Sequence, residues 1–284
     1  MSPHPHEAPE TPAEAWLNRT LPLRHGFCAE IGADLRSHTP IPVDVADKSF
    51  FGDLMERAIG LSLSGQPPYL NLFRLLGDDR AARLLRLAGY DKTCAAPTPT
   101  NVFLVAYRLA QVNQLLNPRW GGRVDPEVIA RFLRRHPDAL PRHCGEAKFE
   151  RRAFDDLWAS FSGGFQTALR SYGNAIAQVP LLGGQRHADF LVGRTVLEVK
   201  SGRLDRDAYI LQLINQLIGY ALLAHVDGHA VTHVAVYAVR YQRLLRFRIE
   251  PLLTRLAGHR LDMDPASGGF AEAVDGRRYG TTAA

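Results

Sequence analysis

The alternation of hydrophobic and polar positions in the C-terminal half of the chain predicts a β-hairpin. Residues 188–192 (Ala-Asp-Phe-Leu-Val) and 195–200 (Thr-Val-Leu-Glu-Val-Lys) both have the pattern of short strands. Only Gly193 and Arg194 lie between them. A glycine in the first position of a two-residue loop suits a type II′ turn. The turn fixes the register, with Val192 facing Thr195.

This register brings two acidic residues together across the hairpin. Asp189 is expected to lie opposite Glu198, and directly opposed residues have Cβ atoms about 4.5–5.5 Å apart. Because side chains alternate between the two faces of a strand, Lys200 shares the face of Glu198. Leu197 and Val199 point the other way, into a core. The hairpin therefore presents two carboxylates and an amine at one place.

A long helix is predicted after the hairpin, with Asp205 or Asp207 as its N-cap. Its apolar residues recur from Ile210 to Leu223 and give a broad buried face. Three polar residues recur every fourth position and stack along one side, namely Gln212, Gln216 and Tyr220. They form either a partly exposed stripe or a polar row directed at the carboxylates.

The order of the remaining elements predicts an α/β fold with a mixed sheet flanked by helices. Further helices are expected at 48–63, 79–87, 101–116, 125–136, 153–171 (with Gly163-Gly164 as a weak point) and 250–257, and further strands at 179–184, 231–240 and 244–249. The expected organisation is a disordered N-terminus (1–15), a mainly helical N-terminal region (16–150), the α/β core (151–258) and a flexible tail (259–284). The helical half covers or extends the core.

Two like charges that face each other across a hairpin destabilise it, so something must offset them. A shared proton, the neighbouring Lys200 or a hard cation would do so. Mg²⁺ fits best, because it takes oxygen ligands and often uses one or two carboxylates plus a phosphate. The alternative is a surface hairpin whose Glu198–Lys200 pair faces water.

The charge of the chain favours an anionic partner. The net charge is +5, and of 34 basic residues four are lysine and 30 are arginine, whose planar fork suits phosphate. Ten basic and five acidic residues fall between 101 and 152. Arg131, Arg134 and Arg135 lie in this segment and are candidate nucleic-acid contacts. The alternative is a solvated helix face.

Other compositional features indicate a cytoplasmic protein. The three cysteines, Cys28, Cys94 and Cys144, are scattered and cannot form a fully paired disulfide set or a four-cysteine iron–sulfur site. The first residues lack the basic and apolar regions of a secretory signal. The most apolar helix is interrupted by polar residues, so no membrane span is expected.

The arrangement of motifs resembles the PD-(D/E)XK nuclease superfamily, in particular its RecB-type branch. The segments that carry the resemblance are His187–Gly193 with its aspartate, Leu197–Lys200 with the E-x-K triplet, Gln216–Tyr220 with the Q-x-x-x-Y spacing, and the closing strand 231–240. The resemblance covers roughly residues 150–250 and implies a restriction-endonuclease-like core.

The resemblance implies roles for these residues. Asp189 and Glu198 would bind Mg²⁺ or Mn²⁺, with the carbonyl of Val199 as a further ligand. Lys200 would position or activate the attacking water, and a cation beside it would depress its pKa. Gln216 and Tyr220 would support the site or contact the nucleic-acid backbone.

Many members of the superfamily add an acidic residue from the helix before the first strand. Three candidates arise here: Asp155 and Asp156 on one helix and Glu56 on another, with Glu56 preferred; a solvated carboxylate is the alternative for each. The expected function is metal-dependent hydrolysis of DNA in phage defence, restriction or repair. The alternative is a non-catalytic nucleic-acid-binding subunit, or a scaffold with a protein partner in a larger complex.

Overall fold

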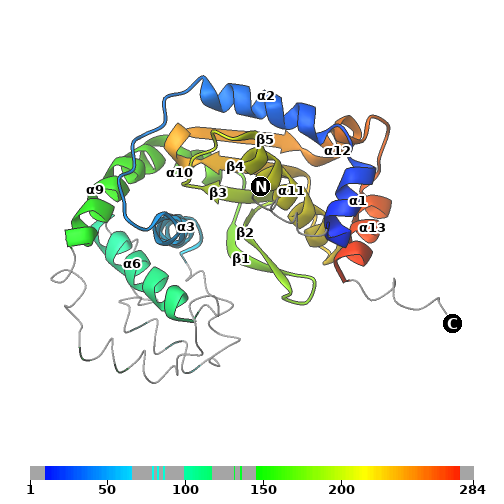
Figure 1. Cartoon of the computed structure of the whole chain (residues 1–284). Coiled ribbons are helices and arrows are strands. Elements are labelled where there is room, and N and C mark those ends of the chain that lie inside the picture. Colours follow the sequence, from blue (N-terminus) through cyan, green and yellow to red (C-terminus); the bar gives the residue numbers. More distant parts are fainter. Residues whose placement is uncertain are drawn as a thin grey trace, which may run out of the picture.

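The computed structural model describes residues 10–65, 99–116 and 145–275, together with the single positions 79, 82, 86, 131 and 135. Within these residues the chain forms one five-stranded sheet with helices on both faces (Figure 1). The sheet order is β1-β2-β3-β4-β5. The strands are β1 (Ala175–Leu181), β2 (Arg186–Val192), β3 (Thr195–Lys200), β4 (His233–Ala238) and β5 (Arg243–Arg248).

The sheet is mixed, which confirms the predicted α/β class. β1, β2 and β3 pair antiparallel, β3 and β4 pair parallel, and β4 and β5 pair antiparallel. A parallel pair needs a long crossover connection. Here α11 (Asp207–Val226) supplies it.

The hairpin between β2 and β3 has the predicted register. Val192 pairs with Thr195, and Phe190 pairs with Leu197. In the turn Gly193 has a φ of 56° and Arg194 has no positive φ, as a type II′ turn requires. A Cβ at Gly193 would lie 2.0 Å from the carbonyl oxygen of Tyr172, so this turn also needs glycine for space.

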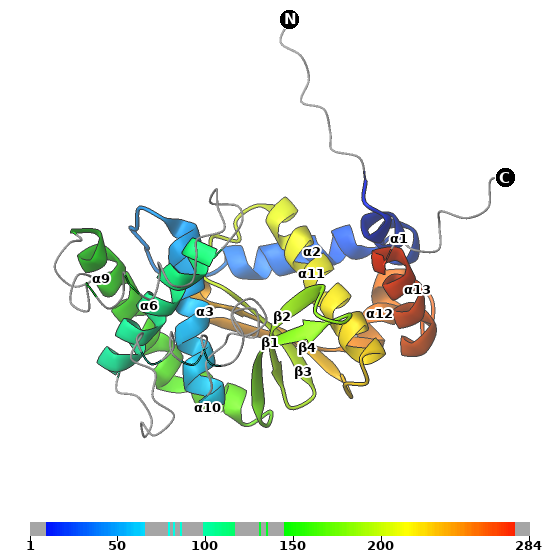
Figure 2. The same ribbon diagram turned by 90° about the horizontal axis from the view of Figure 1, so that it is seen from below.

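The two faces of the sheet bury separate hydrophobic clusters. Phe190, Leu197 and Tyr237 pack on the side of α3 (Lys48–Ser64), α6 (Pro99–Leu116) and α9 (Gly145–Ser160). The other face packs against α1 (Pro12–Thr20), α2 (Arg24–Arg36), α11, α12 (Ile249–Ala257) and α13 (Met263–Asp275). Figures 1 and 2 show α3, α6 and α9 gathered at one side of the molecule and α1 and α13 at the other.

The N-terminal segment is ordered closer to its start than the sequence suggested. The first four residues of α1 (Pro12–Thr20) lie within the region expected to be disordered, so that prediction is wrong for residues 12–15. The Thr11 side chain accepts from the Glu14 amide, and Glu14 in turn accepts from the Thr11 amide. This reciprocal capping box begins the helix at a Thr-x-x-Glu sequence. The prolines and histidines before it have the composition of a disordered segment.

The expected flexible tail is wrong for residues 263–275, which form α13 (Met263–Asp275). Phe270 on α13 meets Trp16 of α1 with ring centroids 5.3 Å apart. It also lies against α11, where a Cβ at Gly219 would be 2.9 Å from the ring. Glycine at position 219 thus permits this close packing. The many small residues of this segment weaken the apolar periodicity by which a helix is predicted from sequence.

Two helix details differ from or refine the expectations. Neither Asp205 nor Asp207 caps α11; Arg206 is the N-cap and makes no side-chain capping bond. Gly163 and Gly164 lie in a π-helical turn, η2 (Phe161–Phe165), between α9 and α10 (Gln166–Arg170), which confirms the weak point. The helices expected at 79–87 and 125–136 lie mostly outside the described residues; positions 79, 82, 86, 131 and 135 are helical.

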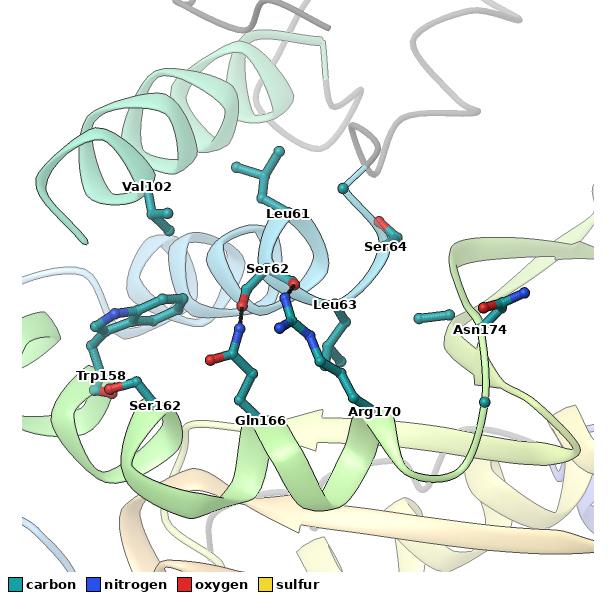
Figure 3. A pocket seen from close by; sticks show the side chains of 13 residues that line it. Leu61, Ser62, Leu63, Ser64, Val102, Trp158, Ser162, Gln166, Arg170 and Asn174 are labelled. Carbon is teal, nitrogen blue, oxygen red and sulfur yellow. Dashed lines mark hydrogen bonds between the residues drawn. The ribbon is translucent and has the colours of Figure 1, made fainter. Parts of the chain in front are cut away.

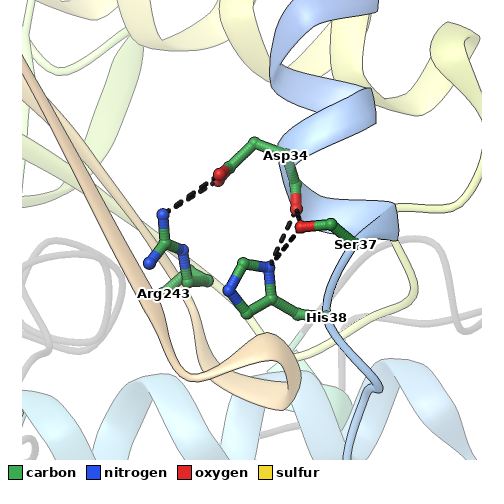
Figure 4. A network of polar contacts seen from close by, with 4 residues as sticks. All are labelled: Asp34, Ser37, His38 and Arg243. Carbon is green, nitrogen blue, oxygen red and sulfur yellow. Dashed lines mark hydrogen bonds and ion pairs between the residues drawn. The ribbon is translucent and has the colours of Figure 1, made fainter.

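Polar contacts anchor α2 on the last strand. Arg243 of β5 donates to both oxygens of Asp34 at 3.1 and 3.2 Å (Figure 4). His38 and Ser37 both contact the Asp34 carbonyl, which closes the end of the helix. The strand therefore keeps a helix from the N-terminal region in place on the same face as α11.

Among the described helices, α11 alone is long and apolar enough to cross a membrane by length and composition. Its residues Ile210, Leu213, Ile214, Leu217 and Ile218 are buried against the sheet and neighbouring helices. Burial in the protein core accounts for this apolar sequence.

Candidate functional site

The site is built where the β1–β2 hairpin separates from β3. The backbone ladder of β2 with β3 ends at the pair Phe190–Leu197, so Asp189 does not pair with Glu198 as a register partner, contrary to the sequence prediction. Instead, Asp189 Oδ2 accepts a hydrogen bond of 3.0 Å from the Val199 amide. The carboxylate thereby replaces a strand partner, and its position is fixed relative to β3.

A change in strand phase accompanies this separation. Phe190 packs on the α3 face and Ala188 packs on the α11 face, although regular alternation would put both on one face. On β1 the same change separates Ala177 from Val179. The residue at the change is Gln178, which has a left-handed φ of 50°. The irregularity places Asp189 between the two faces instead of on either one.

Glu198 is fully buried, with none of its surface exposed. Lys200 Nζ lies 2.8 Å from its Oε2, as expected for two residues on one face of β3. No nitrogen or hydroxyl among the described residues donates a hydrogen bond to Oε1. A buried carboxylate oxygen without a donor is costly, so Glu198 requires compensation beyond the lysine.

Glu56 reaches the same place from α3. Gln178 Nε2 lies 3.4 Å from Glu56 Oε1, and the Arg57 guanidinium is 3.6 Å from the same oxygen. By contrast, Asp155 is exposed and pairs with Arg151, and Asp156 is exposed on the same helix. Of the three acidic candidates, the structure brings Glu56 to the carboxylates.

The three carboxyl groups raise one another's pKa. Burial, and then the charge of Asp189, raise the pKa of Glu56 to about 7. Burial and the charge of Glu198 raise the pKa of Asp189 well above its usual range. Burial also raises the pKa of Glu198, although the Lys200 ammonium lowers it in part. A proton on Asp189 therefore offsets part of the repulsion between the carboxylates.

Lys200 keeps its positive charge at neutral pH. Burial lowers the pKa of the ammonium, but the charges of Glu198 and Asp189 outweigh burial and the net direction is upward. The sequence predicted that a neighbouring cation would depress the pKa of Lys200. The charges of the chain by itself have the opposite effect and raise this pKa. In this environment Lys200 is a donor toward anionic oxygen.

Tyr220, the last residue of the polar stripe of α11, lies within electrostatic range of Glu198 and Asp189. Gln216 Nε2 donates to the Tyr220 hydroxyl at 3.1 Å. Burial and the nearby charge of Glu198 raise the pKa of Tyr220, so its hydroxyl stays protonated at neutral pH. Gln212 lies on the exposed part of the helix. The stripe thus supplies hydroxyl and amide groups beside Glu198.

Gln178 also belongs to the site, although the sequence did not predict it. Gln178 lies in β1, where only the strand from residue 179 was expected, and nothing in its neighbours signals a left-handed residue. Its amide contacts Glu56, so a strained backbone position supports a carboxylate. Such strain persists only where the surrounding structure fixes it, and it is common at functional sites.

Two of the three arginines predicted to contact nucleic acid, Arg131 and Arg135, are among the described residues. Arg131 and Arg135 are helical and exposed, and Arg134 lies outside the described residues. Exposure leaves both described side chains available to an anionic partner. Their part in nucleic-acid binding stays a prediction.

The chemistry of the donor set fits a divalent cation. Glu198 offers an oxygen without a donor, and Asp189 and Glu56 lie in the same charge-coupled cluster. In the part of the chain that the structure describes, no three His, Cys, Asp or Glu side chains lie close enough together to hold a metal ion by themselves. Mg²⁺ often binds through one or two carboxylates, with water and phosphate completing its shell.

Comparisons with protein-family models, with curated proteins and with solved structures find no match to this chain.

Proposed function

We propose that the chain is a metal-dependent nuclease that hydrolyses phosphodiester bonds in DNA, on a core of the restriction-endonuclease type. One observation carries the proposal: Glu198 is fully buried beside Asp189, Lys200 and Glu56 and keeps an oxygen without a hydrogen-bond donor. A chain that needed these residues only for stability would be better served by apolar side chains. By its resemblance, the enzyme would act in the cytoplasm in phage defence, restriction or repair.

Asp189 and Glu198 would hold Mg²⁺ or Mn²⁺, with the Val199 carbonyl as a further ligand and Glu56 reaching it from α3. The cation supplies Lewis acidity, which lowers the pKa of a bound water and offsets charge on the phosphate. The Val199 amide keeps Asp189 oriented through its 3.0 Å hydrogen bond. Because Asp189 has a raised pKa, it must lose its proton when it becomes a ligand.

Lys200 acts as a cationic donor in this proposal. Its ammonium, 2.8 Å from Glu198, can turn toward a phosphate oxygen or hold the attacking water. In the chain alone, the charges of Glu198 and Asp189 raise its pKa and keep it protonated, so in that state it is a donor and not a base. Tyr220 and Gln216, which are bonded to each other, would fix the polar wall beside Glu198.

The test is cleavage of linear and circular DNA with Mg²⁺ or Mn²⁺ by the purified chain and by Glu198→Gln and Lys200→Ala. Both variants should lose roughly a thousandfold in rate, the scale for removal of one key electrostatic group. Glu30→Gln, an exposed carboxylate paired with Arg255, is the matched control and should cut normally. EDTA should abolish cleavage.

Metal binding separates the roles of the two residues. Calorimetry should show Mn²⁺ binding that is weakened by Glu198→Gln and largely kept by Lys200→Ala. If both variants cut DNA at the wild-type rate, the assignment of the site is wrong. If the chain binds neither metal nor cuts DNA, the non-catalytic binding or scaffold interpretation takes its place.

A further inference from the structure

A second pocket lies directly beside the carboxylate site. It has a volume of about 520 Å³, and the residues that follow Lys200 in the chain, beginning with Ser201, form part of its wall. The N-terminal ends of α3 and α11 form other parts, through Lys48 and Arg206. A Cβ at Gly52 of α3 would lie 3.4 Å from Ser201 Oγ, so the helix rests on this wall.

Two helices connect the pocket with the carboxylates. On α3, Lys48, Gly52 and Glu56 follow one another at four-residue spacing, which places Lys48 about 12 Å from Glu56 along one face. On α11, Tyr209 in the pocket lies about two turns before Gln216 on the same side of the helix. A chain-like ligand that occupies the carboxylate site can therefore extend into the pocket.

The pocket is lined by more positive than negative side chains. The cations are Lys48, Arg203, Arg206 and Arg240, and the acids are Asp44 and Asp205. Arg203 lies 3.9 Å from Asp205, which partly neutralises that pair. The remaining excess of positive charge favours an anionic ligand.

Arg240 is the most informative of these cations because it is only 7% exposed. Its Nε donates to the Ile41 carbonyl at 2.9 Å, and no carboxylate among the described residues lies within ion-pair distance of it. Burial and the charge of Arg203 lower the pKa of Arg240. A buried guanidinium beside a second cation is costly unless an anion accompanies it.

The rim of the pocket provides an aromatic surface and a helix end. Tyr209 is 47% exposed, and the Arg206 guanidinium lies 5.6 Å from the centroid of its ring. Arg206 is also the N-cap of α11 and makes no side-chain capping bond. The Tyr209 amide donates to the Arg206 carbonyl at 3.0 Å, which leaves the amides of Asp207 and Ala208 without a side-chain cap at this helix end. Exposed aromatic rings beside arginine stack on nucleic-acid bases.

We propose that this pocket is a nucleic-acid subsite, in which Arg240, Arg203 and Arg206 hold a phosphate of the strand that leads away from the carboxylate site and Tyr209 stacks on an adjacent base. The assignment rests on the proposed nuclease function for its substrate. It predicts a preference for single-stranded or frayed DNA, because a paired base cannot leave the duplex stack without an energetic cost.

Binding is measured without cleavage, by fluorescence anisotropy of a labelled single-stranded oligonucleotide in EDTA over a range of salt concentrations. Tyr209→Leu should weaken binding about tenfold, and this loss should shrink for an oligonucleotide with abasic positions. Arg206→Ala should weaken binding and reduce the salt slope by about 0.7, the value for one phosphate contact on a single strand. Arg260→Ala, an exposed arginine paired with Asp262, is the matched control.

The outcomes separate this proposal from the nuclease assignment. If DNA is cut but neither pocket variant changes affinity or salt slope, the pocket proposal is overturned and the nuclease remains. If the pocket variants weaken binding while no metal supports cleavage, the subsite holds and the nuclease assignment fails. If inorganic phosphate displaces the probe as well as a mononucleotide does, and Tyr209→Leu has no effect, the pocket serves a small anion and the proposal is wrong.

Discussion

Two regions of this molecule differ in how their polar side chains are bonded. In the cavity of about 810 Å³ between α3, α6 and α10, polar groups of the lining are hydrogen-bonded to one another. Gln166 donates to the Ser62 hydroxyl at 2.5 Å, and Arg170 donates to the Ser62 carbonyl at 2.6 Å (Figure 3). At the carboxylate site, acids converge and Glu198 retains an oxygen without a donor.

We therefore expect the carboxylate site, and not the larger cavity, to carry the proposed function. In the larger cavity, Ser62 accepts hydrogen bonds from both Gln166 and Arg170, and Arg170 also reaches the surface. The carboxylate site and its neighbouring basic pocket contain charges that the chain compensates only in part. Incomplete compensation, which lowers stability, is the signature of a group retained for binding or chemistry.

The largest effect on stability should come from the carboxylates. The fold raises the pKa of Glu56 from 4.5 to about 7, so protonated Glu56 favours the folded state. Its contribution is greatest below about pH 4.5 and is lost as the pH rises through 7, by roughly 3 kcal/mol at most. In EDTA, urea unfolding should show a less stable protein at pH 8 than at pH 5.5.

Glu56→Gln isolates this contribution because it keeps the shape and removes the titration. The variant should be more stable than the parent at pH 8 and should show a flatter dependence on pH. Glu30→Gln should leave the pH dependence of the parent unchanged, since Glu30 is exposed and outside the site. Equal pH slopes for Glu56→Gln and the parent would show that Glu56 is not held in a destabilising environment.

A substitution in the larger cavity should lower the stability of the protein, whereas Glu56→Gln should raise it at pH 8. The change in unfolding free energy should also be smaller. Gln166→Ala removes the donor to the Ser62 hydroxyl and should cost about 1 kcal/mol of unfolding free energy. DNA cleavage and metal-induced stabilisation should be unchanged, because this cavity plays no part in the site. Thr167→Ala, an exposed neighbour on α10, is the control. A loss of metal binding in Gln166→Ala would remove the contrast between the two regions.

The sequence predicted what depends on local pattern. The alternation of 188–192 and 195–200 and the glycine turn predicted the register of the hairpin, which placed Glu198 and Lys200 on one face. The long apolar helix predicted the crossover. The sequence did not show the phase change at Gln178, which depends on how β1 and β2 twist away from β3. The sequence favoured Glu56 over Asp155, but the reason that Glu56 reaches the site, the packing of α3 against β1 and β3, is visible only in the structure.

Gln178 gives the smallest and most discriminating test, because strain and contact can be separated there. Its left-handed φ of 50° costs a non-glycine residue about 1–2 kcal/mol, whereas glycine adopts it freely. Gln178→Ala and Gln178→Gly both remove the amide that contacts Glu56. The glycine variant should nevertheless be the more stable by about 0.5–1 kcal/mol, after the greater entropy of its unfolded chain is counted.

If the amide also positions Glu56, both variants should lose metal affinity equally despite their difference in stability. Calorimetry with Mn²⁺ beside urea unfolding measures the two effects independently. Alanine more stable than glycine would mean that residue 178 is not strained and that the phase change of the hairpin has another origin. Unchanged metal affinity in both would limit Gln178 to shaping the strand that carries its neighbours to the site.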